Sequence, residues 1–430
     1  MLQRKVCDRP YEPLDKMSNL TREGRMEPDE IGKRVRYWRN RRGLSRGEFA
    51  QRVGRSPSWV DKVENGDRAL ARLPMLDRVA EALNVSVDVL TRRGTEAAQC
   101  IDAVELDSIR TAIQRVEAVT GIYGRTADHE PNVPRLKQQV RYVWTAFQNS
   151  HYSVLGGQLP RLLVDAQDAA GVVDVTQRAD AHTVLSMAYQ VTASTMWKLK
   201  ESDLGWLAAE RAFRFAERTG DPVLISDAAR RMAHGLMNTG QPGPALDLLR
   251  GDMDRLDPLV SGDSDAELLS VYGMLPLMGA VVASRTGDER SARELLSAGA
   301  HTAERLGSDR NERWTAFGPT NAALHAVSVL VDLGAEAEAV SVALRIDPHG
   351  LELLPRERRA CHYVDVARAE TVRGHHREAL DTLLDADRLA PEEVACRPLA
   401  RDVLSTLCEH WTGRLPVDLN RLASKAGLAA

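Results

Sequence analysis

Residues 44–66 read LSRGEFAQRVGRSPSWVDKVENG, two short amphipathic segments separated by a compact turn. Ser45 stands three residues before Glu48, which is the spacing of a capping box at the start of a helix. Ser56 is followed by Pro57 and starts a second helix in the same way, because proline at the first helical position loses no hydrogen bond. The pattern predicts a helix, a turn and a second helix.

Further helical segments flank this pair. The preceding segment, EIGKRVRYWRNRRG, carries apolar residues at helical spacing and ends at Gly43. The segments LPMLDRVAEALNV and SVDVLTR follow as two more short helices. The apolar faces of the central pair, with Phe49, Val60 and Val63, are expected to form the core. The sequence therefore predicts a compact five-helix domain at residues 29–93.

The composition is that of a soluble globular protein. Hydrophobic residues make up 43% of the 430 residues and charged residues 27%. No uninterrupted apolar run approaches the roughly 18 residues of a membrane helix, and no apolar segment typical of a secretory signal follows the N-terminus. We expect a cytoplasmic, nucleoid-associated protein with no membrane partner. The 49 arginines against 8 lysines suggest a GC-rich bacterial genome.

Charge is unevenly distributed along the chain. Residues 1–93 contain 21 basic and 14 acidic side chains, whereas the remaining residues contain 36 basic and 47 acidic ones. A basic segment joined to an acidic remainder indicates that only the first binds a polyanion.

The rest of the chain reads as helices with an internal repeat. Residues 1–28 lack apolar periodicity and are expected to be a flexible tail. Residues 94–134 form a connector whose segment AVELDSIRTAIQRVEAV is spaced like an amphipathic packing helix. Residues 135–430 carry a recurring alanine, preceded five positions earlier by glycine in its last four copies. The alanines are Ala209, Ala245, Ala292, Ala339 and Ala379, and the glycines are Gly240, Gly287, Gly334 and Gly374. This pattern predicts helical hairpins in series, an α-solenoid of tetratricopeptide-like repeats. The expected fold is all-α.

The motifs LSRGEFA, VGRS and WVDKVENG resemble the Xre and phage-repressor family of helix-turn-helix domains. The resemblance implies that the helix beginning at Pro57 enters the major groove of double-stranded DNA. It also implies that Arg39 pairs with Glu64 inside the domain. The family reads paired half-sites, so a homodimer on a palindromic operator is expected.

The resemblance and the helical geometry assign the DNA contacts. Lys62 is expected to donate to guanine, Ser58 to bond to a base and Trp59 to contact a thymine methyl or the backbone. Pro57 leaves a gap in base reading, where DNA shape would contribute. Arg46 and Ser56 are expected at phosphates and Arg36 to add positive charge. The expected DNA-binding residues are Arg36, Arg46, Ser56, Pro57, Ser58, Trp59 and Lys62.

The repeat predicts a groove lined by the first helix of each hairpin. Arginine and asparagine there suit the amides and carboxylate of a peptide, and apolar side chains would supply pockets. The expected groove residues are Arg230, His234, Met237, Asn238, Arg285, Trp314, Phe317, Asn321, His325 and Arg368. The whole architecture resembles the RRNPP regulators, which implies a peptide or small-molecule effector.

No phosphate-binding loop, zinc-protease or serine-hydrolase motif is present, and the five cysteines show no CxxC spacing. We expect no enzyme activity, cofactor or metal. The sequence predicts a DNA-binding transcriptional regulator with a sensing solenoid. Two alternatives remain open: the solenoid binds a protein partner, such as a sigma factor or an antitoxin-like protein, or it serves only for dimerisation.

Overall fold

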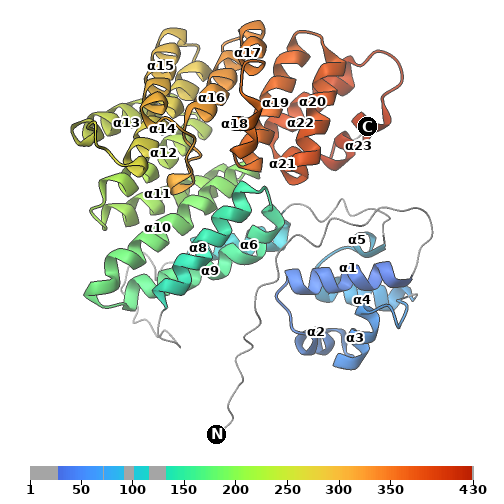
Figure 1. Cartoon of the computed structure of the whole chain (residues 1–430). Coiled ribbons are helices and arrows are strands. Elements are labelled where there is room, and N and C mark those ends of the chain that lie inside the picture. The colour runs from blue at the N-terminus through green and yellow to red at the C-terminus, as the bar shows by residue number, and fades with distance from the viewer. Residues whose placement is uncertain (1–27, 71, 92–100, 116–131, 429–430) are drawn as a thin grey trace. The chain divides into compact units, whose positions relative to one another are not determined.

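The computed structural model describes residues 28–70, 72–91, 101–115 and 132–428, and its regular elements are all helices (Figure 1). The all-α expectation is confirmed. The chain divides into two compact units, Met1–Arg92 and Arg93–Ala430. We call the first the head and the second the body and describe each by itself. Residues 1–27 of the expected tail and residues 94–100 and 116–131 of the expected connector lie outside the described residues.

Five short helices make up the described part of the head, and their bounds follow the predicted caps. They are α1 (Pro28–Arg41), α2 (Arg46–Val53), α3 (Pro57–Glu64), α4 (Leu73–Leu83) and α5 (Val87–Thr91). The core contains Val35 and Trp38 from α1, Phe49 from α2 and Val79 from α4, all fully or almost fully buried. Helix α1 packs on α3, α4 and α5, and α2 packs on α3 and α4.

The body is a longer series of helices joined by short turns. Its first part contains α6 (Ala103–Ile113), α8 (Val133–Gln148), α9 (Tyr152–Val172), α10 (Val175–Lys198), α11 (Ser202–Glu217), α12 (Pro222–Asn238) and α13 (Pro242–Leu256). The middle contains η3 (Asp257–Leu259), α14 (Ala266–Arg285), α15 (Glu289–Leu306), η4 (Glu312–Trp314), α16 (Pro319–Asp332), α17 (Glu336–Ala343) and α18 (Pro348–Leu353). The last part contains α19 (Arg356–Val372), α20 (His376–Leu389), α21 (Pro391–Cys396), α22 (Pro398–His410) and α23 (Val417–Lys425).

The hairpins of the body use the predicted repeat. Each hairpin pairs a first helix, such as α12, α14, α16 or α19, with the helix that follows it. The glycines of the four turns have φ between 74° and 79°, the left-handed region that glycine adopts without strain. The five recurring alanines are fully buried, because a methyl group allows the two helices to approach closely. The predicted α-solenoid is confirmed.

The first helices of the hairpins contact one another and form an inner layer. Helices α10 and α12 are in contact, and the series continues through α14 and α16 to α19. Helix α19 also contacts α8 from the start of the body. Trp144 of α8 stacks on Trp314 with ring centroids 5.5 Å apart, and Gln148 and Asn311 exchange amide hydrogen bonds of 2.9 Å. Helices far apart in the sequence therefore enclose the inner layer.

Helix α14 is long and apolar enough to cross a membrane, since residues 268–284 carry no charge. The expectation that no apolar run approaches that length is wrong for this segment. However, 72% of its most apolar 18-residue window is buried against other helices of the body. The apolar composition of α14 is that of a core helix, because both layers of the solenoid pack around it.

Candidate functional site

Helices α2 and α3 are fixed by side-chain caps on either side of their turn. Ser45 Oγ accepts the N–H of Glu48 at 3.2 Å, and the Glu48 carboxylate accepts the N–H of Ser45 at 2.8 Å. Helix α2 ends at Gly54, whose φ of 67° is left-handed. Ser56 Oγ then accepts the N–H of Trp59 at 3.2 Å and starts α3. These caps set the direction in which α3 leaves the turn.

One face of α3 is buried, and this determines which side chains face outward. Val60 and Val63 are 0% and 1% exposed, and Phe49 belongs to the buried face of α2, which contacts α3. Ser58 and Lys62 lie on the opposite, exposed face of α3. A helix that is anchored on one side and polar on the other can present its outer face to a groove of DNA.

The outer face of α3 borders a hollow of about 460 Å³, which we call the head hollow. Its lining residues are Gly54, Arg55, Ser56, Ser58, Trp59, Lys62 and Arg68. Three of them are cations, and none is acidic. No ion pair joins Arg55, Lys62 or Arg68 to a carboxylate within the described residues. A concave, positively charged surface along a helix is suited to a phosphate group.

The sequence interpretation did not include Arg55 and Arg68 in the site. Arg55 follows the turn glycine directly, and its guanidinium lies 5.9 Å from the ring centroid of Trp59. Arg68 follows the C-terminal end of α3, and its N–H donates to the carbonyl of Lys62 at 3.0 Å. The basic character of RSPSW was visible in the sequence. Arg68 lines the head hollow because of the turn that follows α3, and the sequence did not reveal the geometry of that turn.

Trp59 occupies a different position from the one expected of a base-reading side chain. It is 8% exposed, and its remaining surface forms one wall of the head hollow. This leaves little of the ring available to a thymine methyl. Pro57 and Arg36 are exposed on α3 and α1, and neither lines the hollow.

The buried carboxylate of Glu64 connects α1, α2 and α3. Arg39 donates to it through Nε at 2.5 Å and through a terminal nitrogen at 3.1 Å. The structure contains the ion pair that the family resemblance implies. Arg46, which was expected at a phosphate, also donates to Glu64 at 3.1 Å and pairs with Asp61 at 3.3 Å. Its side chain is partly exposed, so its first role here is to join α2 to α3.

Residues 30–93 match a family model described as a helix-turn-helix domain. This segment is a helix-turn-helix domain. Among solved structures, the chain is similar to Bacillus thuringiensis PlcR, described in complex with the peptide PapR7 and DNA. The identity is 13%, the match covers 65% of this chain and 96% of that chain, and the TM-score is 0.26. A comparison with curated proteins finds no match.

The cap of α3 gives a first prediction for the helix-turn-helix domain. Ser56→Ala should lower the free energy of unfolding of this domain by about 1 kcal/mol, because the N–H of Trp59 loses its side-chain acceptor. Hydrogen exchange of α3 in the full chain measures the change. Ser58→Ala on the exposed face is the matched control and should leave exchange unchanged. Equal exchange in the two variants would contradict the capping role.

In the body, three of the residues expected to line a groove are core residues instead. Phe317 and Asn321 are fully buried, and Met237 is almost fully buried. Phe317 packs against Gly273, where a β-carbon would lie 2.0 Å from the ring. Asn321 donates to the carbonyl of Thr315 at 3.4 Å. The expectation that these side chains line an open surface needs correction, because their surfaces are covered by neighbouring helices.

Other expected groove residues are paired within the body. Arg230 is buried and pairs with Asp227 at 2.5 Å. Arg285 and Arg368 pair with the same carboxylate of Asp332, which joins α14, α16 and α19. Asn238 is partly buried at the end of α12. The structure therefore distributes these side chains over separate contacts and does not gather them on one polar strip.

Two histidines of the expected set lie on the inner layer in uncharged form. Burial lowers the pKa of His234 well below its usual value, and the ring lies 4.5 Å from that of Trp197. Burial also lowers the pKa of His325 to about 3, and its Nδ1 lies 2.8 Å from the carbonyl oxygen of Asn321. Both imidazoles are therefore neutral near pH 7.

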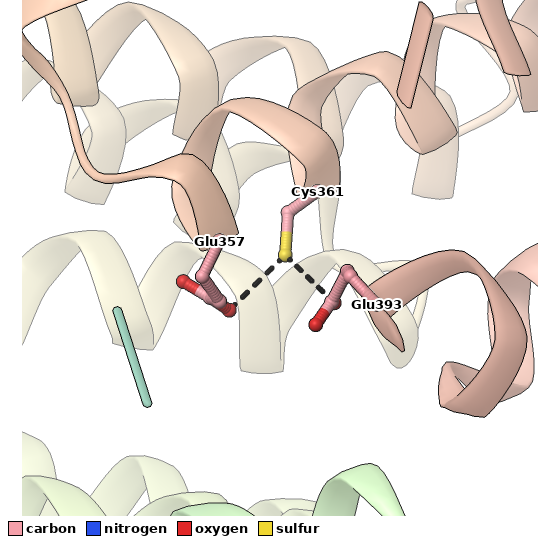
Figure 2. Close-up of side chains that lie close together, drawn as sticks. All are labelled: Glu357, Cys361 and Glu393. Atoms are coloured by element: carbon pink, nitrogen blue, oxygen red, sulfur yellow. Dashed lines mark hydrogen bonds between the residues drawn. The ribbon is translucent and has the colours of Figure 1, made fainter. Parts of the chain in front are cut away.

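Three side chains in the body have the donor set of a metal site. Figure 2 shows Glu357 and Cys361 of α19 beside Glu393 of α21, with ligand atoms within 4.8 Å of one another. Lys198 Nζ lies 2.6 Å from both carboxylates, and Arg397 pairs with Glu393 at 3.0 Å. We call these five residues the ion cluster. Its two cations balance its two carboxylates, and burial raises the pKa of the Cys361 thiol and keeps it neutral. The arrangement is that of a buried ion network.

Proposed function

We propose that the chain is a sequence-specific DNA-binding transcriptional regulator whose helix-turn-helix domain reads the major groove through α3. The observation that carries this proposal is the head hollow, where Arg55, Lys62 and Arg68 lie along the outer face of α3 without an acidic neighbour in the lining. The cations of the hollow would bind the DNA backbone, whose negative charge supplies most of the non-specific affinity. Ser58 and Lys62 would contact base edges from the exposed face of α3.

The proposal extends to the assembly and to the body. A single helix-turn-helix domain contacts few base pairs, so we propose a homodimer on two half-sites about one helical turn apart. We propose further that residues 135–430 sense a peptide or small molecule and alter DNA binding. The function is regulatory and non-enzymatic, and it places the protein on DNA in the cytoplasm.

Selection from a pool of random duplexes by the full chain tests the proposal. We expect enrichment of a two-fold symmetric motif. Equilibrium binding of the full chain to the selected duplex is then measured. Lys62→Ala should weaken that binding about 10- to 100-fold, because a donor to a base or phosphate is lost from α3. Arg78→Ala, which removes an exposed cation on α4 outside the head hollow, is the matched control. Recovery of no motif, or equal loss in both variants, would overturn the assignment of α3.

A further inference from the structure

Arg231 on α12 is a partly buried cation without an anionic partner. Its guanidinium carbon lies 5.1 Å from the ring centroid of Trp144, and that ring stacks on Trp314. Its Nε is buried without a hydrogen-bond acceptor. No carboxylate forms an ion pair with Arg231 within the described part of the body. A guanidinium held against an aromatic face keeps its planar edge of N–H groups available to a ligand.

More positive charge reaches this position from neighbouring helices of the inner layer. Arg358 of α19 is partly exposed, and its nearest paired oxygen, on Glu357, is 3.7 Å away. Burial, Arg230 and Arg358 lower the pKa of Arg231 to about 9, while Asp227 and Glu357 act in the opposite direction. Burial, Arg358 and Arg230 likewise lower the pKa of His325. Groups on α12, α16 and α19 therefore lie within electrostatic reach of one another.

The carboxylates of this region are already engaged by other cations. Asp227 accepts a hydrogen bond from Arg230 at 2.5 Å. Glu357 and Glu393 both accept from Lys198 at 2.6 Å. Among the described residues, Arg231 is therefore left without a carboxylate at ion-pair distance, and Arg358 has one such carboxylate, that of Glu357, at 3.7 Å. A cation in such a partly desolvated position raises the free energy of the folded state unless an anion pairs with it.

Three unmet hydrogen-bonding groups at or beside Arg231 are donors, and one, Asp227 Oδ2, is an acceptor. Arg230 and Trp144 are both more than nine-tenths buried, and Arg230 Nε and Trp144 Nε1 have no acceptor in the structure. Arg231 Nε has the same status. Buried polar groups in proteins are nearly always satisfied, so unmet donors that gather around one cation indicate an acceptor-rich ligand. Carboxylate and phosphate groups have that character and match the planar fork of arginine.

We propose that Arg231 and Arg358, supplied by α12 and α19, bind a carboxylate or phosphate group of the effector. The inference rests on the proposed sensing function and adds the chemical class of the ligand, an oxyanion. The stacked pair of Trp144 and Trp314 holds the Arg231 guanidinium in place. Arg230 and the neutral His234 and His325 border the same part of the inner layer. An anion bound there contacts helices from the first and last parts of the body.

Calorimetric titration of the full chain without DNA tests the site. The probes are inorganic pyrophosphate for the phosphate arm and citrate for the carboxylate arm, with chloride at equal ionic strength as the reference. We expect one of these probes to bind and to raise the melting temperature of the body. Arg231→Gln and, separately, Arg358→Gln should weaken that binding at least tenfold. The probe that binds more tightly identifies whether the ligand group is a phosphate or a carboxylate.

Two control variants distinguish this site from other cationic surfaces. Lys62→Ala removes a cation of the head hollow and should leave the tighter binding unchanged. Arg290→Gln removes a highly exposed arginine on α15 that pairs only with Glu294 among the described residues, and it should also bind normally. Binding that is lost in Lys62→Ala and retained in Arg231→Gln would overturn the inference, as would no binding of either probe. Circular dichroism of each variant confirms that the helices remain folded.

The outcomes separate this inference from the proposed DNA-binding function. Normal motif selection with no anion binding would contradict the oxyanion site alone. Anion binding by a chain that selects no DNA motif would contradict the regulator and leave the site standing.

Discussion

Lys198→Met is expected to lower the free energy of unfolding of the body by about 3–5 kcal/mol, the usual effect of breaking a buried ion pair from one side. Lys198 is 14% exposed at the side chain and donates to Glu357 and Glu393 at 2.6 Å. Burial alone would lower the pKa of Lys198, but the carboxylates of Glu357 and Glu393 raise it overall. The methionine variant would leave two buried carboxylates with one fewer cation.

The position of the ion cluster increases the effect. Lys198 ends α10, whereas Glu357 and Glu393 belong to α19 and α21, so the cluster joins helices separated by more than 150 residues. Tyr152 of α9 also donates to Glu393. Loss of Lys198 therefore loosens the contact between the first and last parts of the body.

Chemical denaturation of the full chain, followed by circular dichroism, measures the effect of Lys198→Met. Lys137→Met is the matched control, because Lys137 pairs with Asp180 at 2.7 Å in an exposed position. The Lys137 side chain is 39% exposed and that of Asp180 is 57% exposed. An exposed pair of this kind contributes about 0–1 kcal/mol. Similar unfolding curves for the two variants would show that the ion cluster does not stabilise the body.

Arg39→Met has the second large expected effect, a loss of about 3–5 kcal/mol in the stability of the helix-turn-helix domain. Glu64 is 2% exposed and would keep only Arg46, a partly exposed partner. Arg39 also donates to the carbonyl of Leu44 at 2.7 Å, just before α2. The substitution therefore removes the connection between α1 and the start of the α2–α3 pair.

Hydrogen exchange of α1–α3 in the full chain measures the effect of Arg39→Met, and exchange in the body serves as an internal reference. The double variant Arg39→Met with Glu64→Met should recover part of the loss, since no buried charge then remains unpaired. An unchanged exchange rate in the single variant would contradict the structural role of this pair. No recovery in the double variant would show that the hydrogen bond to Leu44 matters more than the charge.

Much of the fold could be predicted because its signals are local. The capping box at Ser45, the proline after Ser56 and the turn glycines act within a few residues, so each leaves a readable pattern. The repeat is also local, because each buried alanine serves one hairpin. The pair of Arg39 and Glu64 was available only through resemblance to a known family.

The inner surface of the body could not be read in the same way. Sequence spacing placed Phe317 and Asn321 on an open groove, but packing across hairpins covers both side chains. The ion cluster and the stacking of Trp144 on Trp314 join segments more than 150 residues apart. Such contacts depend on the small rotation between successive hairpins, summed along the whole solenoid. No single repeat encodes that sum.

Genome-wide capture of DNA bound by the wild-type protein and by Lys62→Ala, expressed at equal levels, tests the central claim most directly. We expect the wild-type protein to occupy a limited set of sites that share one symmetric motif. Lys62→Ala should lose most of that occupancy while keeping its helical content and its melting temperature. Recovery of the same sites at equal strength by both proteins would contradict the assignment of α3 as the DNA-reading helix.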